Sequence, residues 1–242
     1  MRRHMFRWSP ARIIAGAFGS ISFIGSILLY LPWGHMPGQS ITYVDALYTA
    51  VSALCVTGLS IVDTAAVFNP FGQAILAVLI QVGGLGVSTM GAGVLLMLGR
   101  KVGIRQRNLI HDTMNLDSYS GVVRFLRTLF ATTVFIEIIG AFLGYFVFRR
   151  DYEMMESIGL SIFHSISSFN NAGLTILTKE RSMEMYAEDP FMLILTTALV
   201  FVGGLGFIVI RECWVNRFRW RKLSMHSRVY GRIPSDWRRC AP

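Results

Sequence analysis

Long apolar stretches alternate with short polar segments along the chain. Four of them reach the roughly 20 residues that a helix needs to cross a bilayer, and they occupy positions 13–31, 71–98, 129–148 and 191–210. Glu137 is the only charged residue within them. Two weaker apolar stretches, 46–62 and 157–178, lie between the members of each pair. The pattern therefore predicts a helix, a weakly apolar segment and a second helix, twice over.

The distribution of Lys and Arg indicates whether the weak stretches cross the membrane. These residues gather at the N-terminus, between positions 100 and 127, and after position 210. Cytoplasmic segments of membrane proteins are enriched in Lys and Arg. Only four crossings place all three basic clusters on one side, so we expect the weak stretches to enter the plasma (inner) membrane from its outer face and return. Both termini are then cytoplasmic, with an N-terminal segment at 1–12, a basic linker at 99–120 and a basic tail at 211–242.

Composition places the chain outside the soluble classes. Hydrophobic residues make up 53% of it and charged residues 15%, against about 25% charged in a soluble domain. The net charge of +9 does not favour a nucleic-acid partner, because the basic residues flank the apolar stretches, where they suit a lipid interface. The three cysteines form no CxxC pair, and no catalytic Ser/His/Asp arrangement or Walker sequence occurs. We therefore expect no enzyme and no cofactor.

Three features of the sequence fit more than one role. Acidic residues in the outer segments suit either an acidic mouth that concentrates cations or ordinary loop solvation. Glu137 suits either an ion pathway or a hydrogen-bonded contact between helices. His164 suits either a proton relay or a packed, neutral side chain.

The chain contains two copies of one pattern. The segment SALCVTGL at 52–59 corresponds to SSFNNAGL at 167–174, and QVGGLG at 81–86 corresponds to FVGGLG at 201–206. Order and spacing agree, apart from a few additional residues in the second copy. Repeats define the structural unit of a fold. The two repeats are assigned to residues 13–98 and 121–210.

Each weak stretch begins with an apolar run, at 46–54 and 160–168, that is too short to span a bilayer. Nine helical residues cover about 13 Å, roughly half the hydrocarbon core. The backbone must then turn inside the membrane, where only protein or a water-filled cavity satisfies it. Gly58 and Gly173 follow at matching positions and permit the left-handed angles that align successive carbonyls. Such carbonyls replace the hydration shell of a cation, so the pattern predicts two re-entrant pore loops.

A glycine-rich segment in each repeat predicts close helix packing rather than ligand binding. Small residues let membrane helices approach one another closely. We expect each second helix to pack against the short helix of its own repeat. The packing residues are Gly83, Gly84, Gly86, Gly203, Gly204 and Gly206.

Together with the doubled VGGLG, the two loops resemble the Ktr/Trk/HKT superfamily of potassium-uptake proteins. The resemblance covers about residues 10–228, and the start of the chain at the first pore-domain helix is similar to the Ktr membrane subunit. It implies four helix–pore-loop–helix repeats around one pore, each contributing one filter strand. Carried onto this chain, the filter residues that bind potassium are Val56, Thr57, Gly58, Asn171, Ala172 and Gly173. The filter-flanking residues are Cys55, Leu59, Asn170 and Leu174.

The resemblance also implies an activity and partners. The family's membrane subunit takes up potassium, often with sodium dependence, and potassium at the filter is the only metal expected. The subunit works as a homodimer on a cytoplasmic ring of nucleotide-binding regulatory subunits. We therefore expect an all-α integral membrane protein that transports a monovalent cation.

The chain departs from the family in holding two repeats rather than four. It is expected to form half of a four-repeat pore, with four transmembrane helices plus two re-entrant pore loops. The family continues into a third apolar span where residues 229–242 are polar, basic and without pattern, which predicts a truncation or a change of frame. A second copy or a separately encoded half would then supply the other loops. The alternative is a non-transporting fragment that acts only as an interaction partner.

Overall fold

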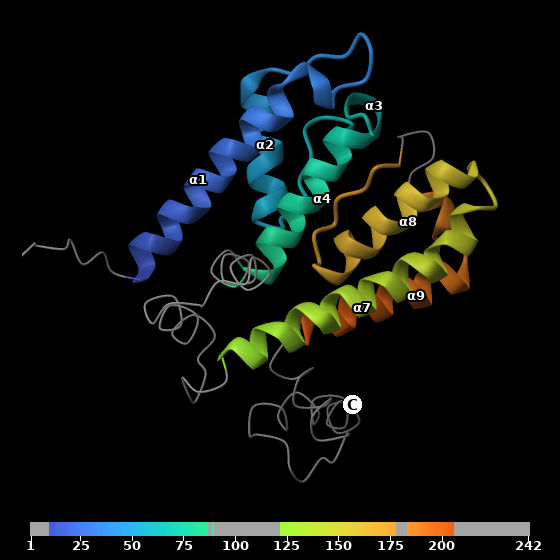
Figure 1. Ribbon diagram of the computed structural model, residues 1–242. Helices are drawn as coiled ribbons and strands as arrows, with labels where there is room; N and C mark the ends of the chain where they lie inside the picture. Colours follow the sequence, from blue (N-terminus) through green and yellow to red (C-terminus); the bar gives the residue numbers. More distant parts are fainter. Residues whose placement is uncertain (1–9, 87–88, 90–121, 178–182, 206–242) are drawn as a thin grey trace, which may run out of the picture.

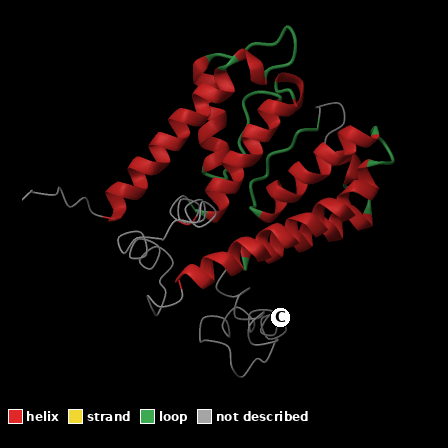
Figure 2. Cartoon of the chain, viewed as in Figure 1, coloured by secondary structure: helices red, strands yellow, loops and turns green. Residues whose placement is uncertain are grey.

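The computed structural model describes residues 10–86, 89, 122–177 and 183–205, and this part of the chain is helical, with no β-strand (Figures 1 and 2). One isolated bridge joins His35 to Phe68. The first half contains α1 (Pro10–Tyr30), a 3-10 turn (Pro32–Gly34), α2 (Tyr43–Leu54), α3 (Thr64–Val67) and α4 (Pro70–Leu85). The second half contains α7 (Val122–Phe148), α8 (Met154–Phe169), a 3-10 turn (Met183–Tyr186) and α9 (Pro190–Gly204).

The two halves repeat one arrangement of three helices. The short helix α2 packs against α1 and α4, and α8 packs in the same way against α7 and α9 (Figure 1). The contact between the first and the last helix of each half is also repeated, because a Cβ on Gly25 would meet the side chain of Leu79 and one on Gly140 would meet that of Leu199. The halves join where α4 contacts α8.

Local sequence fixes where the helices begin. Thr42 and Asp45 form a reciprocal capping box at the start of α2, with the Asp45 amide 3.2 Å from the Thr42 hydroxyl. Asn69 caps α4 and Asp189 caps α9, each through a side-chain oxygen that accepts two backbone N–H groups. A proline follows each cap, where its missing N–H costs nothing. The last helices of the two halves, α4 and α9, therefore begin with the same capping motif.

The short helices are longer than the hydropathy pattern predicts. The α2 helix has 12 residues and α8 has 16, whereas the apolar runs at 46–54 and 160–168 hold nine each. Most of the additional residues form the first turns. That of α2 begins at the capping box of Thr42, and that of α8 carries exposed side chains such as Met155. Even α8, at about 24 Å, is shorter than the roughly 30 Å hydrocarbon core of a bilayer.

One helix among the described residues, Leu126–Phe148 within α7, is by itself long and apolar enough to cross a membrane. Three other helical segments are apolar but shorter, namely Ile14–Tyr30, Pro70–Leu85 and Pro190–Gly204. The α4 helix stops at Leu85, where Gly86 adopts a φ of +82°. The rest of the expected span at 71–98, apart from Thr89, lies outside the described residues, as does 206–210 of the fourth span.

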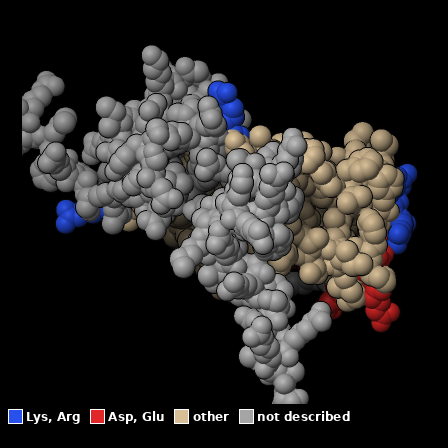
Figure 3. Space-filling view, turned by 90° about the horizontal axis from the view of Figure 1, so that it is seen from below, with Lys and Arg blue, Asp and Glu red and all other residues tan. Residues whose placement is uncertain are grey.

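The outer surfaces of the helices are apolar. On α7, the side chains of Phe135, Ile138 and Phe142 are 54%, 61% and 62% exposed. In the face drawn in Figure 3, most of the visible described surface carries neither acidic nor basic side chains, and the charged ones stand at its margins. An exposed apolar surface of this extent is typical of a protein that contacts lipid or another chain.

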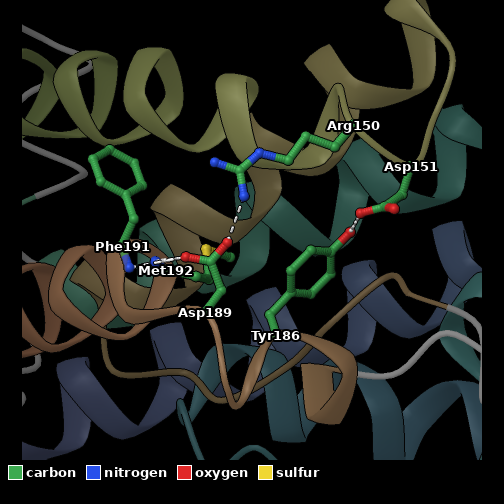
Figure 4. Close-up of polar contacts among 6 residues, drawn as sticks. All are labelled: Arg150, Asp151, Tyr186, Asp189, Phe191 and Met192. Atoms are coloured by element: carbon green, nitrogen blue, oxygen red, sulfur yellow. Dashed lines mark hydrogen bonds and ion pairs between the residues drawn. The ribbon is translucent and has the colours of Figure 1, made fainter.

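A polar cluster holds the turn between α7 and α8 to the start of α9 (Figure 4). Arg150 lies 2.7 Å from Asp189, and the Tyr186 hydroxyl donates to Asp151 at 2.9 Å. Asp189 also accepts the N–H groups of Phe191 and Met192. The Met192 N–H first, then the Phe191 N–H and the charge of Arg150, hold the pKa of Asp189 below its ordinary value against an opposing effect of partial burial.

We expect Asp189→Asn to lower thermal stability at neutral pH. Asparagine keeps a capping oxygen but loses the charge that the helix end and Arg150 favour. A carboxyl with a lowered folded pKa stabilises the protein above its unfolded pKa, and this contribution disappears as the pH falls through the folded pKa. The difference in melting temperature between wild type and variant should therefore be constant above about pH 5 and shrink below about pH 4.

The control for this pH series is Glu188→Gln, which removes an exposed carboxylate from the same turn. It should show no such pH-dependent difference. A difference for Asp189→Asn that persists undiminished below about pH 4 would mean that the charge of Asp189 contributes nothing.

Candidate functional site

Two loops that follow the short helices meet at the junction of the two halves. Loop one covers residues 55–59 after α2, and loop two covers residues 170–174 after α8. A Cβ atom placed on Gly58 would lie 2.7 Å from the carbonyl oxygen of Ala172 and 3.4 Å from the Cα of Gly173. A Cβ on Gly173 would lie 3.6 Å from the Cα of Gly58. The two glycines therefore bring the backbones of the loops into direct contact.

The backbones of the loops alternate between two conformations at matching positions. Val56 and Gly58 have φ values of +56° and +74°, and Asn171 and Gly173 have values of +58° and +69°. Glycine tolerates this region and asparagine is enriched in it, but a β-branched residue there is an outlier. Such a conformation costs about 1–3 kcal/mol and persists only where its surroundings hold it in place. The strain at Val56 marks loop one as a functional candidate.

The residues expected in the filter differ in how far they are buried. Ala172 is 1% exposed and Leu174 is 5% exposed, whereas Leu59 is 60% exposed and Cys55 is an exposed free thiol. Loop two borders an open cavity of about 480 Å³. Its lining includes Asn171, Gly173, Leu174, His164 and Thr196.

The glycine-rich ends of α4 and α9 lie against the ends of the short helices. A Cβ on Gly83 would overlap the carbonyl oxygen of Leu54, and one on Gly203 would overlap that of Phe169. Each contact is within one repeat. A Cβ on Gly84 would instead overlap the side chain of Asn170 in the other repeat.

The other glycines of this group are placed differently. A Cβ on Gly204 would meet Asn171 Nδ2 at 3.9 Å, an ordinary contact. Gly86 ends α4 through its positive φ, and among the described residues its Cβ position meets only Thr89, at 3.8 Å. Gly206 lies outside the described residues.

The described part of the chain contains no group of side chains that could form a conventional metal site. No three His, Cys, Asp or Glu side chains gather there. His164 is instead bonded through Nε2 to the hydroxyls of Thr196, at 3.0 Å, and Ser168, at 3.3 Å. The carbonyl oxygen of Ala172 lies at the contact of the two loops.

Comparison with known proteins identifies the fold family. The TrkH model, described as cation transport protein, matches residues 10–228. The chain belongs to the TrkH family. This confirms the resemblance that the two loops and the doubled VGGLG indicate.

Characterised TrkH relatives are similar to the chain along most of its length. The Ktr system potassium uptake protein B of Bacillus subtilis is 34% identical over 92% of the chain and 49% of its own length. The potassium/sodium uptake protein NtpJ of Enterococcus hirae is 35% identical, with the same coverage. The Ktr system potassium uptake protein B of Vibrio alginolyticus is 35% identical over 94% of the chain and 50% of its own length. The chain thus spans about half the length of these relatives.

The TrkH chain also contains a polar contact that sequence patterns do not reveal. Asn170 Nδ2 donates to Gln81 Oε1 at 3.0 Å and to Glu137 Oε1 at 3.3 Å. This cluster joins α4 of the first repeat to α7 and α8 of the second. The sequence gives one indication of this cluster, a difference between the two repeats. Gln81 is a polar residue at the position where the second repeat has the exposed Phe201. The hydrogen bond of Glu137 with Asn170 is a contact between helices, one of the two roles open to this residue.

We expect Gln81→Ala to destabilise the chain by about 1–3 kcal/mol, because Asn170 loses a hydrogen-bond acceptor in a partly buried site. Thermal unfolding of the purified chain in detergent measures the loss. Gln73→Ala is the matched control, since Gln73 lies on the same helix and bonds only locally to Phe68 at 2.9 Å. Equal melting temperatures for the two variants would show that the cluster does not stabilise the junction of the repeats.

Proposed function

We propose that the chain takes up potassium ions across the plasma membrane, with loops one and two forming two of the four walls of a selectivity filter. The observation that supports this most directly is the pair of loops with positive φ at matching positions, in contact at Gly58 and Gly173. A backbone of this kind offers carbonyl oxygens as ligands, which suit a desolvated monovalent cation. The proposed filter residues are those named above, Val56 to Gly58 and Asn171 to Gly173.

The choice of potassium rests on the relatives. Three of the similar proteins are named for potassium uptake by the Ktr system, and NtpJ is named for potassium and sodium. We infer that potassium is the preferred ion here and that sodium is the second candidate, as a coupled ion or as a competitor.

Two loops surround only part of an ion. The chain matches about half the length of its relatives, and two further loops, in a second half of the pore, are needed to surround the ion. The exposed apolar faces of α7 and α9 are suited to lipid or to that second half. A cytoplasmic regulatory ring is proposed by analogy with the Ktr systems of the relatives.

Uptake in a potassium-uptake-deficient bacterial host tests the proposal. The chain is expressed alone and together with the second half of a full-length relative. Growth at low potassium and influx of radioactive rubidium in either case support transport. If neither growth nor rubidium influx is seen under either condition, with the chain present in the membrane, the alternative of a non-transporting fragment is favoured.

We also propose that both termini and the segment around Arg105 face the cytoplasm. A cysteine engineered at position 105 of a cysteine-free variant should react with a membrane-impermeant maleimide only after the cells are opened. Cysteines at position 61, in the loop between α2 and α3, should react in intact cells. Labelling at 105 in intact cells would contradict the topology.

A further inference from the structure

One serine in the last turn of each short helix is bonded to the loop that follows it at two points. The Ser52 carbonyl accepts the N–H of Thr57 at 3.1 Å, and its hydroxyl donates to the carbonyl of Leu59 at 2.5 Å. Ser167 does the same in the second repeat. Its carbonyl accepts the N–H of Ala172 at 2.8 Å, and its hydroxyl donates to the carbonyl of Leu174 at 2.6 Å.

The two bonds of each serine enclose the glycine at which the loops touch. The bonded residues stand five and seven positions after the serine, and Gly58 or Gly173 stands between them. Left-handed backbone is unfavourable for Val56 and must be held by its surroundings. A bond on each side of the glycine supplies that constraint.

The hydroxyl bond also limits which carbonyls remain for an ion. The oxygens of Leu59 and Leu174 are directed at the helix hydroxyls and not at the contact between the loops. Ser167 is 3% exposed and its partner Leu174 is 5% exposed, so the bond in the second repeat is shielded from water. In the first repeat Ser52 is buried but its partner Leu59 is 60% exposed. A shielded hydrogen bond that is lost leaves its carbonyl without a partner.

We propose that Ser52 and Ser167 are positioning residues of the ion-binding loops, each fixing the loop of its own repeat in the conformation that selects the ion. This inference rests on the proposed function of the loops. It is carried by the repetition of the same two bonds in both repeats, since only three of the eight residues in the aligned segments are identical, at 52 and 167, 58 and 173, and 59 and 174.

The two repeats should respond to different degrees. The Thr57 hydroxyl donates to the backbone carbonyl of Ser52 at 3.4 Å, and this bond remains in Ser52→Ala, so loop one keeps an additional anchor. The second repeat has Ala172 at that position. Ser167→Ala should therefore disturb its loop more than Ser52→Ala does.

Hydrogen–deuterium exchange of the full chain in lipid nanodiscs tests the anchoring, with potassium or sodium chloride as the only salt. Backbone amides of 55–60 or 170–175 should exchange about fivefold faster in the corresponding alanine variant, as expected for the loss of one hydrogen bond. Slower exchange in potassium than in sodium is expected for wild type, and this difference should be reduced in both variants. Ser161→Ala is the matched control, because Ser161 is 2% exposed on the same helix as Ser167 but bonds only to Ile158 of that helix.

Competition of potassium and sodium against rubidium uptake provides the second measurement. In an assembly that transports, Ser167→Ala should reduce the preference for potassium about fivefold, and Ser161→Ala should leave it unchanged. Unaltered exchange of the loops in both serine variants would overturn the inference whether or not the chain transports. Faster exchange with unaltered ion preference would also overturn it. Faster exchange, together with no uptake and no difference between the salts in wild type, would overturn the proposed function and leave the anchoring supported.

Discussion

Gly83→Ala and Gly203→Ala should each strongly destabilise the packing between the second helix of a repeat and the end of its short helix. The added methyl group would overlap the carbonyl oxygen of Leu54 or Phe169, and the corresponding carbonyl carbons lie at 2.7 Å and 2.8 Å. All of these atoms are backbone, so no side chain can rotate away. Overpacking costs about 1–3 kcal/mol where neighbours can shift, and we expect the upper end of that range or more. The melting temperature of the purified chain in detergent measures the effect.

Gly159→Ala separates this overlap from the general effect of replacing a helical glycine. A Cβ on Gly159, in α8, meets nothing within 4 Å among the described residues. Alanine is a better helix former than glycine by about 1 kcal/mol, so this control should be neutral or stabilising. If Gly83→Ala and Gly203→Ala have the same melting temperature as Gly159→Ala, the close approach of the helices is not needed for stability.

The sequence predicts the helical class and the correspondence of two segments, but not that the segments meet. Aligning SALCVTGL with SSFNNAGL places Gly58 opposite Gly173, and the structure brings these two glycines into contact. A repeated pattern of caps and glycines favours the same fold in both copies, although the copies meet through different elements, α4 of the first and α8 of the second.

Hydropathy does not reveal where the short helices begin. It detects apolar residues and therefore misses first turns that are set by capping, such as the Thr42 and Asp45 box of α2. For the last helix of each half, the cap is readable in the sequence, since Asn69-Pro70 and Asp189-Pro190 mark the starts of α4 and α9.

Other features depend on tertiary contacts that no local pattern encodes. The positive φ of Val56 contradicts the preference of a β-branched residue. The cluster of Gln81, Glu137 and Asn170 joins elements up to 89 positions apart. Ser52 and Ser167 are visible in the alignment as an identical pair, but only the structure reveals that each is bonded to its loop at two points.

Gly58→Ser and Gly173→Ser should each weaken the preference for potassium over sodium in any assembly that transports. Both glycines have positive φ, and a residue with a Cβ pays about 1–2 kcal/mol in that region. Gly58→Ser should be the more severe, because its Cβ would also lie 2.7 Å from the carbonyl oxygen of Ala172. A distortion of about 1.4 kcal/mol at an ion site changes relative affinity tenfold. We therefore expect about a tenfold loss of preference for Gly173→Ser and a larger loss for Gly58→Ser, measured by sodium competition against rubidium uptake.

Gly38→Ser distinguishes an effect on the filter from the strain of the substitution itself. Gly38 has a φ of +81° and lies in the segment before α2, with nothing within 4 Å of its Cβ position among the described residues. The variant therefore carries the same backbone strain without touching either loop. It should lose stability and keep its ion preference. Equal ion preference in Gly58→Ser, Gly173→Ser and Gly38→Ser would exclude loops one and two as the site of selection. The same backbone strain would then affect ion preference no more inside the loops than outside them.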